Sequence, residues 1–120
     1  MIVDSNILID ALRLKPEAVK FLGSRERAFS ISVISIAELY AGVRDGREIE
    51  ELQLFLKSFT VHRIDEKVAL LAGQYKKKYA KPHDLDLGDA LIAATATIAG
   101  EELATLNTKH FPMLKAVRPY

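Results

Sequence analysis

Apolar residues recur along this chain of 120 residues with two different periods, and the two periods alternate. Short runs rich in β-branched residues predict strands at residues 1–3, 28–33, 59–64, 103–106 and 116–118. Apolar residues three and four positions apart predict helices at residues 5–13, 16–23, 35–42, 47–58 and 86–100, and another between Asp65 as N-cap and Pro82 as helix breaker. Strands that alternate with helices in this way predict an α/β domain with a mainly parallel sheet.

Composition narrows the class of protein only moderately. A length of 120 residues with 49% hydrophobic residues fits one folded domain. The net charge of +1 excludes a strongly basic nucleic-acid coat but allows a local site for a polyanion. The absence of cysteine excludes disulfides, thiol nucleophiles and cysteine-bound metal centres. With no recognisable signal peptide and no apolar run long enough for a bilayer, we expect a soluble cytoplasmic domain.

Polar residues that could carry chemistry follow the predicted strands. Asp4 and Asn107 come directly after two of them, and Glu38 and Asp89 are expected in the first turns of helices beside them. Ligand sites in parallel sheets form outside the carboxyl ends of the strands. The predicted topology therefore places all four residues at one edge of the sheet.

Each acid also has a purely structural interpretation. Ser35 and Glu38 fit a capping box, in which the glutamate binds a backbone N–H group at the helix start. Asp86 followed by Asp89 fits the same arrangement, and Asp4 fits an N-cap. The joint pattern of the acids is more informative than any single position.

Gathered carboxylates favour a divalent cation, because they repel one another when no basic partner is present. An all-oxygen ligand set, without cysteine or spaced histidines, favours Mg²⁺ or Mn²⁺ over zinc. Such ions commonly serve phosphate-ester hydrolysis. The sequence therefore indicates a metal-dependent reaction on a phosphate ester.

Four segments in this order resemble the PIN domain family, and most closely the VapC-type toxins of toxin–antitoxin pairs. The opening strand and first acid lie in IVDSNILID at residues 2–10, and the second acid lies in ISVISIAELYAG at residues 31–42. The third acid begins the block DALIAATA at residues 89–96. The last block is ATLN at residues 104–107, followed by His-Phe at 110–111. The resemblance covers nearly the whole chain.

This resemblance implies a single PIN-like domain over residues 1–120, with three layers and a central, mainly parallel sheet of about five strands flanked by helices. It implies a Mg²⁺- or Mn²⁺-dependent endoribonuclease. Asp4, Glu38 and Asp89 would ligate the metal and act in catalysis. Asn107 matches a fourth catalytic position that more often holds aspartate, so it supplies a neutral oxygen there.

Five further residues are assigned to supporting roles. Ser5 and Thr105 match hydroxyl positions that orient the acids or a phosphate oxygen. Asp86 is expected first as an N-cap and second as an outer-sphere carboxylate. Arg44 and Lys109 are candidate contacts for RNA phosphates.

The family also implies RNA as substrate, a cognate antitoxin protein and a homodimer, with no membrane. Two other functions remain open at this point. A PIN-like module that binds RNA or protein without cutting would fit the neutral Asn107. A phospho-receiver domain would share the acids at strand ends, although it requires paired acids where Ser5 and Asn6 follow Asp4.

Overall fold

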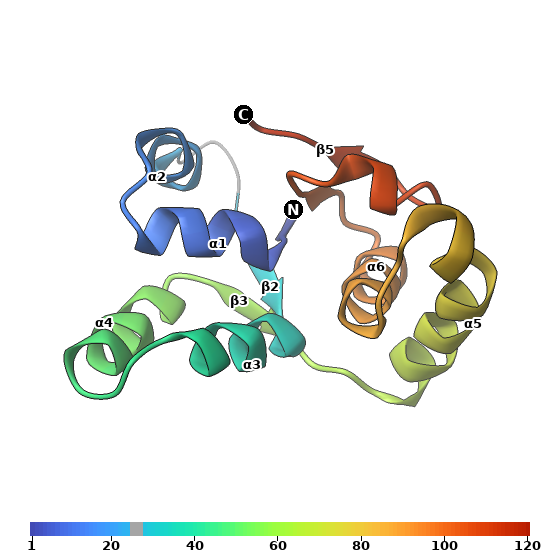
Figure 1. The fold of residues 1–120 in the computed structure, drawn as a ribbon, viewed down its shortest axis with the longest axis horizontal. Helices are drawn as coiled ribbons and strands as arrows, with labels where there is room; N and C mark the ends of the chain where they lie inside the picture. The colour runs from blue at the N-terminus through green and yellow to red at the C-terminus, as the bar shows by residue number, and fades with distance from the viewer. Residues whose placement is uncertain (25–27) are drawn as a thin grey trace.

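The computed structural model describes residues 1–24 and 28–120, which form five strands and seven helical segments within these ranges. Figure 1 shows their arrangement. In chain order they are β1 Ile2–Val3, α1 Ser5–Leu12, α2 Pro16–Gly23, β2 Ser30–Ser32, α3 Val33–Gly42, α4 Arg47–Leu56, β3 Thr60–His62, α5 Glu66–His83, α6 Leu87–Ala99, β4 Leu103–Ala104, the 3₁₀ helix η1 Thr108–His110 and β5 Ala116–Val117.

The five strands form one sheet in the order β3-β2-β1-β4-β5, and all of its pairings are parallel. The chain builds the sheet outward from β1 through β2 to β3, then crosses to the other side of β1 to form β4 and β5. The strand β1 is thus the point at which the direction of winding changes. Ligands bind at such switch points, outside the carboxyl ends of the strands.

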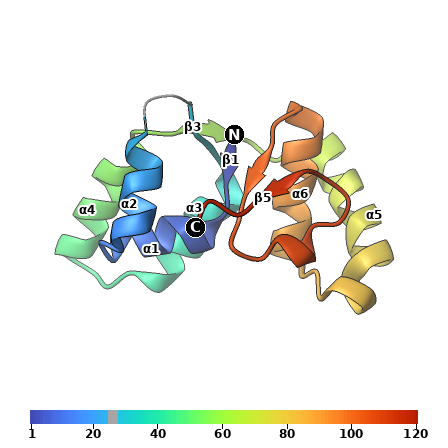
Figure 2. The ribbon, with the colours of Figure 1, turned by 90° about the horizontal axis from the view of Figure 1, so that it is seen from above.

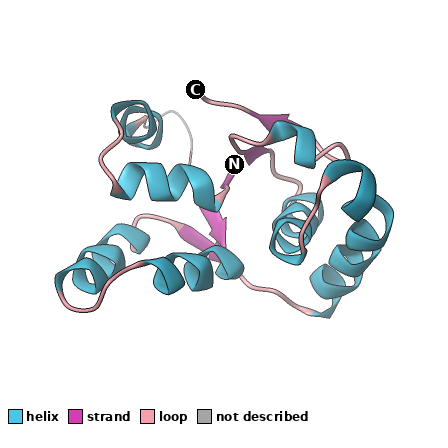
Figure 3. Cartoon of the chain, in the orientation of Figure 1, coloured by secondary structure: helices cyan, strands magenta, loops and turns pink. Residues whose placement is uncertain are grey.

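Helices cover both faces of the sheet and make three layers (Figures 2 and 3). One core joins Val3 and Ile31 to buried residues of α1, α3 and α4. The other joins Ile2 and Leu103 to buried residues of α5 and α6. Successive residues of β1 therefore point to opposite cores, as the alternation of a strand requires. The expected α/β architecture with a parallel sheet of five strands is confirmed.

Two departures from the predicted boundaries change how a residue is interpreted, and one of them matters for the site. The second strand ends at Ser32, whose hydroxyl accepts a hydrogen bond from the Ile34 N–H group at 3.2 Å and caps α3. Ser35 is therefore the third residue of the helix and does not form a capping box. Glu38 lies beyond the first turn, where the backbone N–H groups are already bonded within the helix. Its carboxylate is free for another role.

The second difference concerns Pro82, which was expected to break the fifth helix. It lies inside α5, which continues to His83 and ends with Asp84 in the left-handed conformation (φ 52°). A proline so close to the end removes only one intrahelical hydrogen bond, so the helix ends just after it.

No helix in the described ranges is long and apolar enough to cross a membrane.

The helix α6 fits closely between α5 and the sheet because its buried face is made of small residues. Four of its alanines are completely buried (Ala90, Ala93, Ala94 and Ala96). Its N-terminus is capped by Asp86, and Gly100 follows its last residue in the left-handed conformation (φ 67°). Small side chains let the helix backbone approach its neighbours, so α6 holds the acids at its N-terminus in a rigid setting.

Enlarging one of these alanines should destabilise the fold. We expect Ala94→Leu to lower the free energy of unfolding by about 1–3 kcal/mol, because the added atoms have no space. Ala99→Leu, at an exposed position of the same helix, should change it by less than about 0.5 kcal/mol. Urea denaturation of both variants measures the difference. Equal stabilities would show that α6 is not closely packed.

Candidate active site

Asp4 is the centre of the candidate site, at the carboxyl end of β1. It is buried, with 6% of its surface exposed. Its Oδ1 accepts a hydrogen bond from the Ser5 N–H group at 2.7 Å, so it caps α1 as expected. Its Oδ2 accepts one from the Thr105 hydroxyl at 2.7 Å. These two bonds fix both oxygens of a side chain between β1 and β4.

Ser5 connects Asp4 to Glu38. Its backbone N–H group binds Asp4, and its hydroxyl donates to Glu38 Oε1 at 2.9 Å. One residue therefore holds carboxylates from β1 and α3, which lie 34 positions apart in sequence. Ser5 thus contacts both acids at this edge of the sheet, and its role in orienting them stays a prediction.

The N-terminus of α6 contributes two further carboxylates. Asp86 Oδ1 accepts a hydrogen bond from the Asp89 N–H group at 2.7 Å, so Asp86 is the N-cap and Asp89 lies in the first turn. Gly88 lies between them, and a Cβ atom there would stand 3.4 Å from Asp86 Oδ1 and 3.7 Å from Glu38 Oε2. The start of α6 thus faces Glu38 of α3 across a short gap.

The electrostatics show that these acids share one environment. Burial is the main cause that raises the pKa of Asp4, Glu38 and Asp89. The pKa of Asp89 rises to about 6. The negative charge of Asp86 raises the pKa of all three acids, and the negative charge of Asp4 raises the pKa of Glu38 and Asp89. Hydrogen bonds from Thr105 and Ser5 lower the pKa of Asp4 and Glu38, but by less than burial and repulsion raise it. The site therefore favours a bound proton or cation.

The loop after β4 brings Thr105, Asn107 and His110 toward the same place. The Asn107 N–H group donates to the Thr105 hydroxyl oxygen at 3.1 Å, and Asn107 precedes η1. Its own side chain is exposed and makes no hydrogen bond with the acids. His110 Nδ1 lies 3.8 Å from Asp89 Oδ2. The catalytic role expected for Asn107 stays a prediction.

His110 and Arg13 are residues near the site that sequence reasoning missed. His110 lacks a second histidine at metal-binding spacing, so no ligand motif marks it. Its position three residues after Asn107, in a loop that begins at a strand end, is the signal that could have found it. Arg13 directly follows α1, and only the packing of α1 against α3 brings it toward Glu38.

Two polar hollows lie near the acids, one lined by Glu38 itself and the other by His110, which lies close to Asp89. One has a volume of about 300 Å³, lies between α1 and α3, and is lined by Glu38, Arg13 and Arg44 among others. The other has a similar volume, about 300 Å³, and its lining is Lys81, Pro82, His83, Asp84, Lys109 and His110. In Figure 1 the elements of the first hollow lie left of the sheet and those of the second lie right of it. Arg44 and Lys109, the expected phosphate contacts, are thus on opposite flanks of the site.

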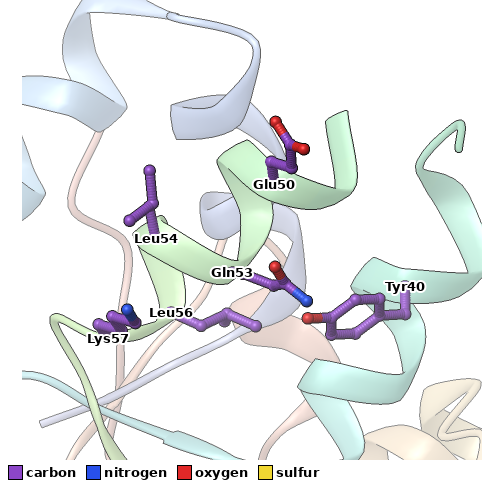
Figure 4. A pocket seen from close by; sticks show the side chains of 6 residues that line it. All are labelled: Tyr40, Glu50, Gln53, Leu54, Leu56 and Lys57. Atoms are coloured by element: carbon purple, nitrogen blue, oxygen red, sulfur yellow. The ribbon is translucent and has the colours of Figure 1, made fainter. Parts of the chain in front are cut away.

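A third hollow is unrelated to the acids. It lies between α3 and α4, has a volume of about 550 Å³ and is lined by Tyr40, Glu50, Gln53, Leu54, Leu56 and Lys57. Figure 4 shows the Tyr40 ring directed toward Gln53 and Leu56. None of the residues expected to carry chemistry lines it. Its size alone therefore does not make it a catalytic site.

The donor set at the acid site fits a hard cation. Its side chains offer carboxylate and hydroxyl oxygens, with His110 as the nearest imidazole. In the described ranges, no three Asp, Glu or His side chains are close enough together, as they stand, to hold a metal ion. Carboxylates without a counter-ion repel one another, and a bound cation would remove that repulsion. Asp4, Glu38 and Asp89 are the residues that could close on a cation.

Comparison with known proteins places the chain in a family. The model of the PIN domain matches residues 1–115. The chain belongs to the PIN domain family. Ribonuclease VapC10 of Mycobacterium tuberculosis is 41% identical to it over 99% of this chain and 91% of that protein. Ribonuclease VapC19 of the same species is 32% identical over 98% of this chain and 97% of that protein. The resemblance to VapC-type PIN domains is confirmed.

Solved structures agree with this assignment. A toxin-antitoxin complex from Klebsiella pneumoniae contains a chain that superposes on this PIN domain with a TM-score of 0.85 and 31% identity, covering 99% of this chain and 97% of that one. FitAcB from Neisseria gonorrhoeae gives a TM-score of 0.76 at 27% identity, covering 98% and 96%. Family membership removes the phospho-receiver alternative.

The raised pKa of Asp89 predicts a specific pH dependence of the metal-free PIN domain. Because its pKa is higher in the folded chain than in the unfolded one, ionisation of Asp89 destabilises the fold, fully above about pH 6 and not at all well below pH 4. In EDTA at pH 7 we expect Asp89→Asn to be more stable than the parent by about 1 kcal/mol, allowing for solvent screening. That corresponds to a few degrees in melting temperature.

The gap between the two melting temperatures should narrow as the pH falls from 7 to 4. Differential scanning calorimetry at each pH measures it. A gap that stays constant over this range, or a less stable variant at pH 7, would contradict the electrostatic account of the site.

Proposed function

We propose that this PIN domain is a Mg²⁺- or Mn²⁺-dependent endoribonuclease and the toxin of a toxin–antitoxin pair. The observation that carries the proposal is the group of acids at the carboxyl end of β1, where burial and mutual repulsion raise the pKa of Asp4, Glu38 and Asp89. The relatives named ribonuclease support the choice of RNA as substrate. RNA would be cut at a phosphodiester bond between the two polar hollows.

The roles of the residues follow from their contacts. Asp4, Glu38 and Asp89 would hold the cation, and Asn107 would add a neutral oxygen from its exposed side chain. A divalent cation in this position supplies a nucleophilic water at neutral pH and offsets the charge of the phosphate. Thr105 and Ser5 keep the oxygens of Asp4 and Glu38 oriented. Preorganised acids of this kind reduce the rearrangement needed when substrate binds.

Asp86 acts on the site without being one of its ligands. One of its oxygens is used as the N-cap of α6, which fixes the backbone of Asp89. Its charge adds to the negative field that attracts a cation, since it raises the pKa of the other acids. We assign Asp86 as a positioning and outer-sphere residue.

An antitoxin partner is supported by an apolar hollow on the far side of α1. This hollow of about 330 Å³ is lined by Leu14, Val19, Leu22 and Phe55 among others. Leu14 is 78% exposed and has a left-handed backbone (φ 60°), which is strained for leucine. An amphipathic segment of an antitoxin would cover these side chains.

We further propose a homodimer located in the cytoplasm, as expected from the family.

Removing any of the three acids should abolish cleavage. We expect Asp4→Asn, Glu38→Gln and Asp89→Asn each to lower the rate of RNA cleavage by about a hundredfold or more, because the cation loses a charged ligand. EDTA should have the same effect, reversed by Mg²⁺. Gel electrophoresis of labelled RNA measures the rates, and melting curves check that each variant folds.

The control is Glu50→Gln, an exposed glutamate on α4 outside the site, which should cut at the parent rate. The upstream product should end in a 3′-hydroxyl and the downstream product should begin with a 5′-phosphate, because water is the nucleophile. A 2′,3′-cyclic phosphate would show attack by the ribose instead. Parent protein that binds RNA but never cuts it would favour the non-catalytic binding module.

Asn107 offers a separate test of the metal site. We expect Asn107→Asp to tighten Mn²⁺ binding about fivefold, because an added charge a few ångströms away contributes about 1 kcal/mol at surface-like dielectric. The same charge should lower the metal-free melting temperature through repulsion by the other acids. Isothermal titration calorimetry compares the parent, Asn107→Asp and the neutral control Asn107→Ser. Equal affinities and equal melting temperatures would place Asn107 outside the site.

A further inference from the structure

Two arginines line the hollow that opens at Glu38, and in the described part of the chain neither forms an ion pair with that glutamate. The hollow lies between α1 and α3, and its apolar lining includes Ile9, Leu12 and Leu39. Arg13 comes from the end of α1 and Arg44 from the loop after α3. We propose that Arg13 and Arg44 form a subsite for a phosphate of the RNA strand that flanks the scissile bond on the Glu38 side. This proposal rests on the proposed ribonuclease activity.

Arg13 is the stronger of the two candidates because its guanidinium has no other use. The residue caps α1 through its backbone N–H group, which bonds to Ile9 and Ala11 carbonyl oxygens. Its side chain forms no ion pair or hydrogen bond with the described part of the chain. A charged group beside an apolar surface and without a partner is well suited to bind an anion from outside.

Arg44 has a partner that a ligand can replace. Its Nε lies 3.5 Å from Glu48 Oε2, and the Arg44 side chain is 90% exposed. Exposed ion pairs of this kind contribute little to stability. A phosphate that reaches the hollow can therefore take the place of Glu48 at small energetic cost. Arg44 and Arg13 then face the same ligand from two walls.

The arginines are not present to neutralise Glu38. Glu38 accepts a hydrogen bond from the Ser5 hydroxyl, and in the described part of the chain neither Arg13 nor Arg44 forms an ion pair with it. Both cations line the same hollow as Glu38 without pairing with it. They remain available for a second anion next to the acid site.

A phosphate of RNA is the anion that fits this place. The scissile phosphate must reach the acids. The neighbouring phosphate of the same strand must therefore lie beside the acids, on one of the two flanks. Guanidinium groups offer paired N–H donors that match phosphate oxygens. The hollow at Glu38 thus provides cationic donors beside the acids, along the path of a bound strand.

Binding can be separated from cleavage by measuring both. Fluorescence anisotropy of a labelled single-stranded RNA of mixed sequence, titrated with Asp89→Asn protein in Mg²⁺, gives affinity without cutting. In this background Arg13→Ala and Arg44→Ala should each weaken binding about fivefold to tenfold. Each should also reduce the slope of log affinity against log salt by about 0.7, the value for one lost phosphate contact on a single strand. Arg13→Lys should keep the slope and lose less affinity, because the charge remains.

The matched control is Arg47→Ala. Arg47 starts α4, is 90% exposed like Arg44, and pairs with Glu51 four residues later as Arg44 pairs with Glu48. It is not part of the hollow at Glu38, so its loss should change affinity less than twofold. Arg13→Ala and Arg44→Ala proteins that bind like this control, while parent protein still cuts RNA, would overturn the subsite and leave the ribonuclease standing. Parent protein that neither binds nor cuts RNA would overturn both.

Discussion

The buried carboxylate of Asp4 is the interaction on which the rest of the site depends. Both of its oxygens are engaged, one by the first N–H group of α1 and one by the hydroxyl of Thr105 after β4. A buried charge is costly unless hydrogen bonds satisfy it, and these bonds compensate only in part. The remaining cost appears as a raised pKa. The fold thus keeps a destabilising group at the switch point of its sheet, which is common where a site must bind a cation.

The other acids extend this arrangement from different elements. Ser5 donates hydrogen bonds to both Asp4 and Glu38 of α3. Asp86 caps the start of α6, which carries Asp89. The hydrogen bonds that Asp4 and Asp86 accept also cap α1 and α6. The same contacts therefore stabilise local structure and bring negative charges together. A cation would relieve the repulsion that remains between them.

The surroundings of the acids divide into regions of different chemistry. Cationic side chains line the hollows on both flanks, at Arg13 and Arg44 on one side and at Lys109 on the other. The apolar hollow around Leu14 lies farther along α1. An RNA strand would be attracted by the cationic flanks and directed to the acids between them. A protein partner would meet the apolar surface without entering that path.

The sequence by itself determined the order of the elements, the parallel sheet and the identity of the acids, because period and strand-end position are local properties. Asp4 and Asp86 act as N-caps where the sequence placed them. The local sequence did not determine which serine caps α3, since Ser32 and Ser35 are both followed by apolar residues. In the structure Ser32 is the cap. Only the tertiary structure joined Asp4 to Thr105, which are 101 positions apart, and brought His110 and Arg13 to the site. Contacts between distant segments depend on how helices and strands pack, and no local pattern records that packing.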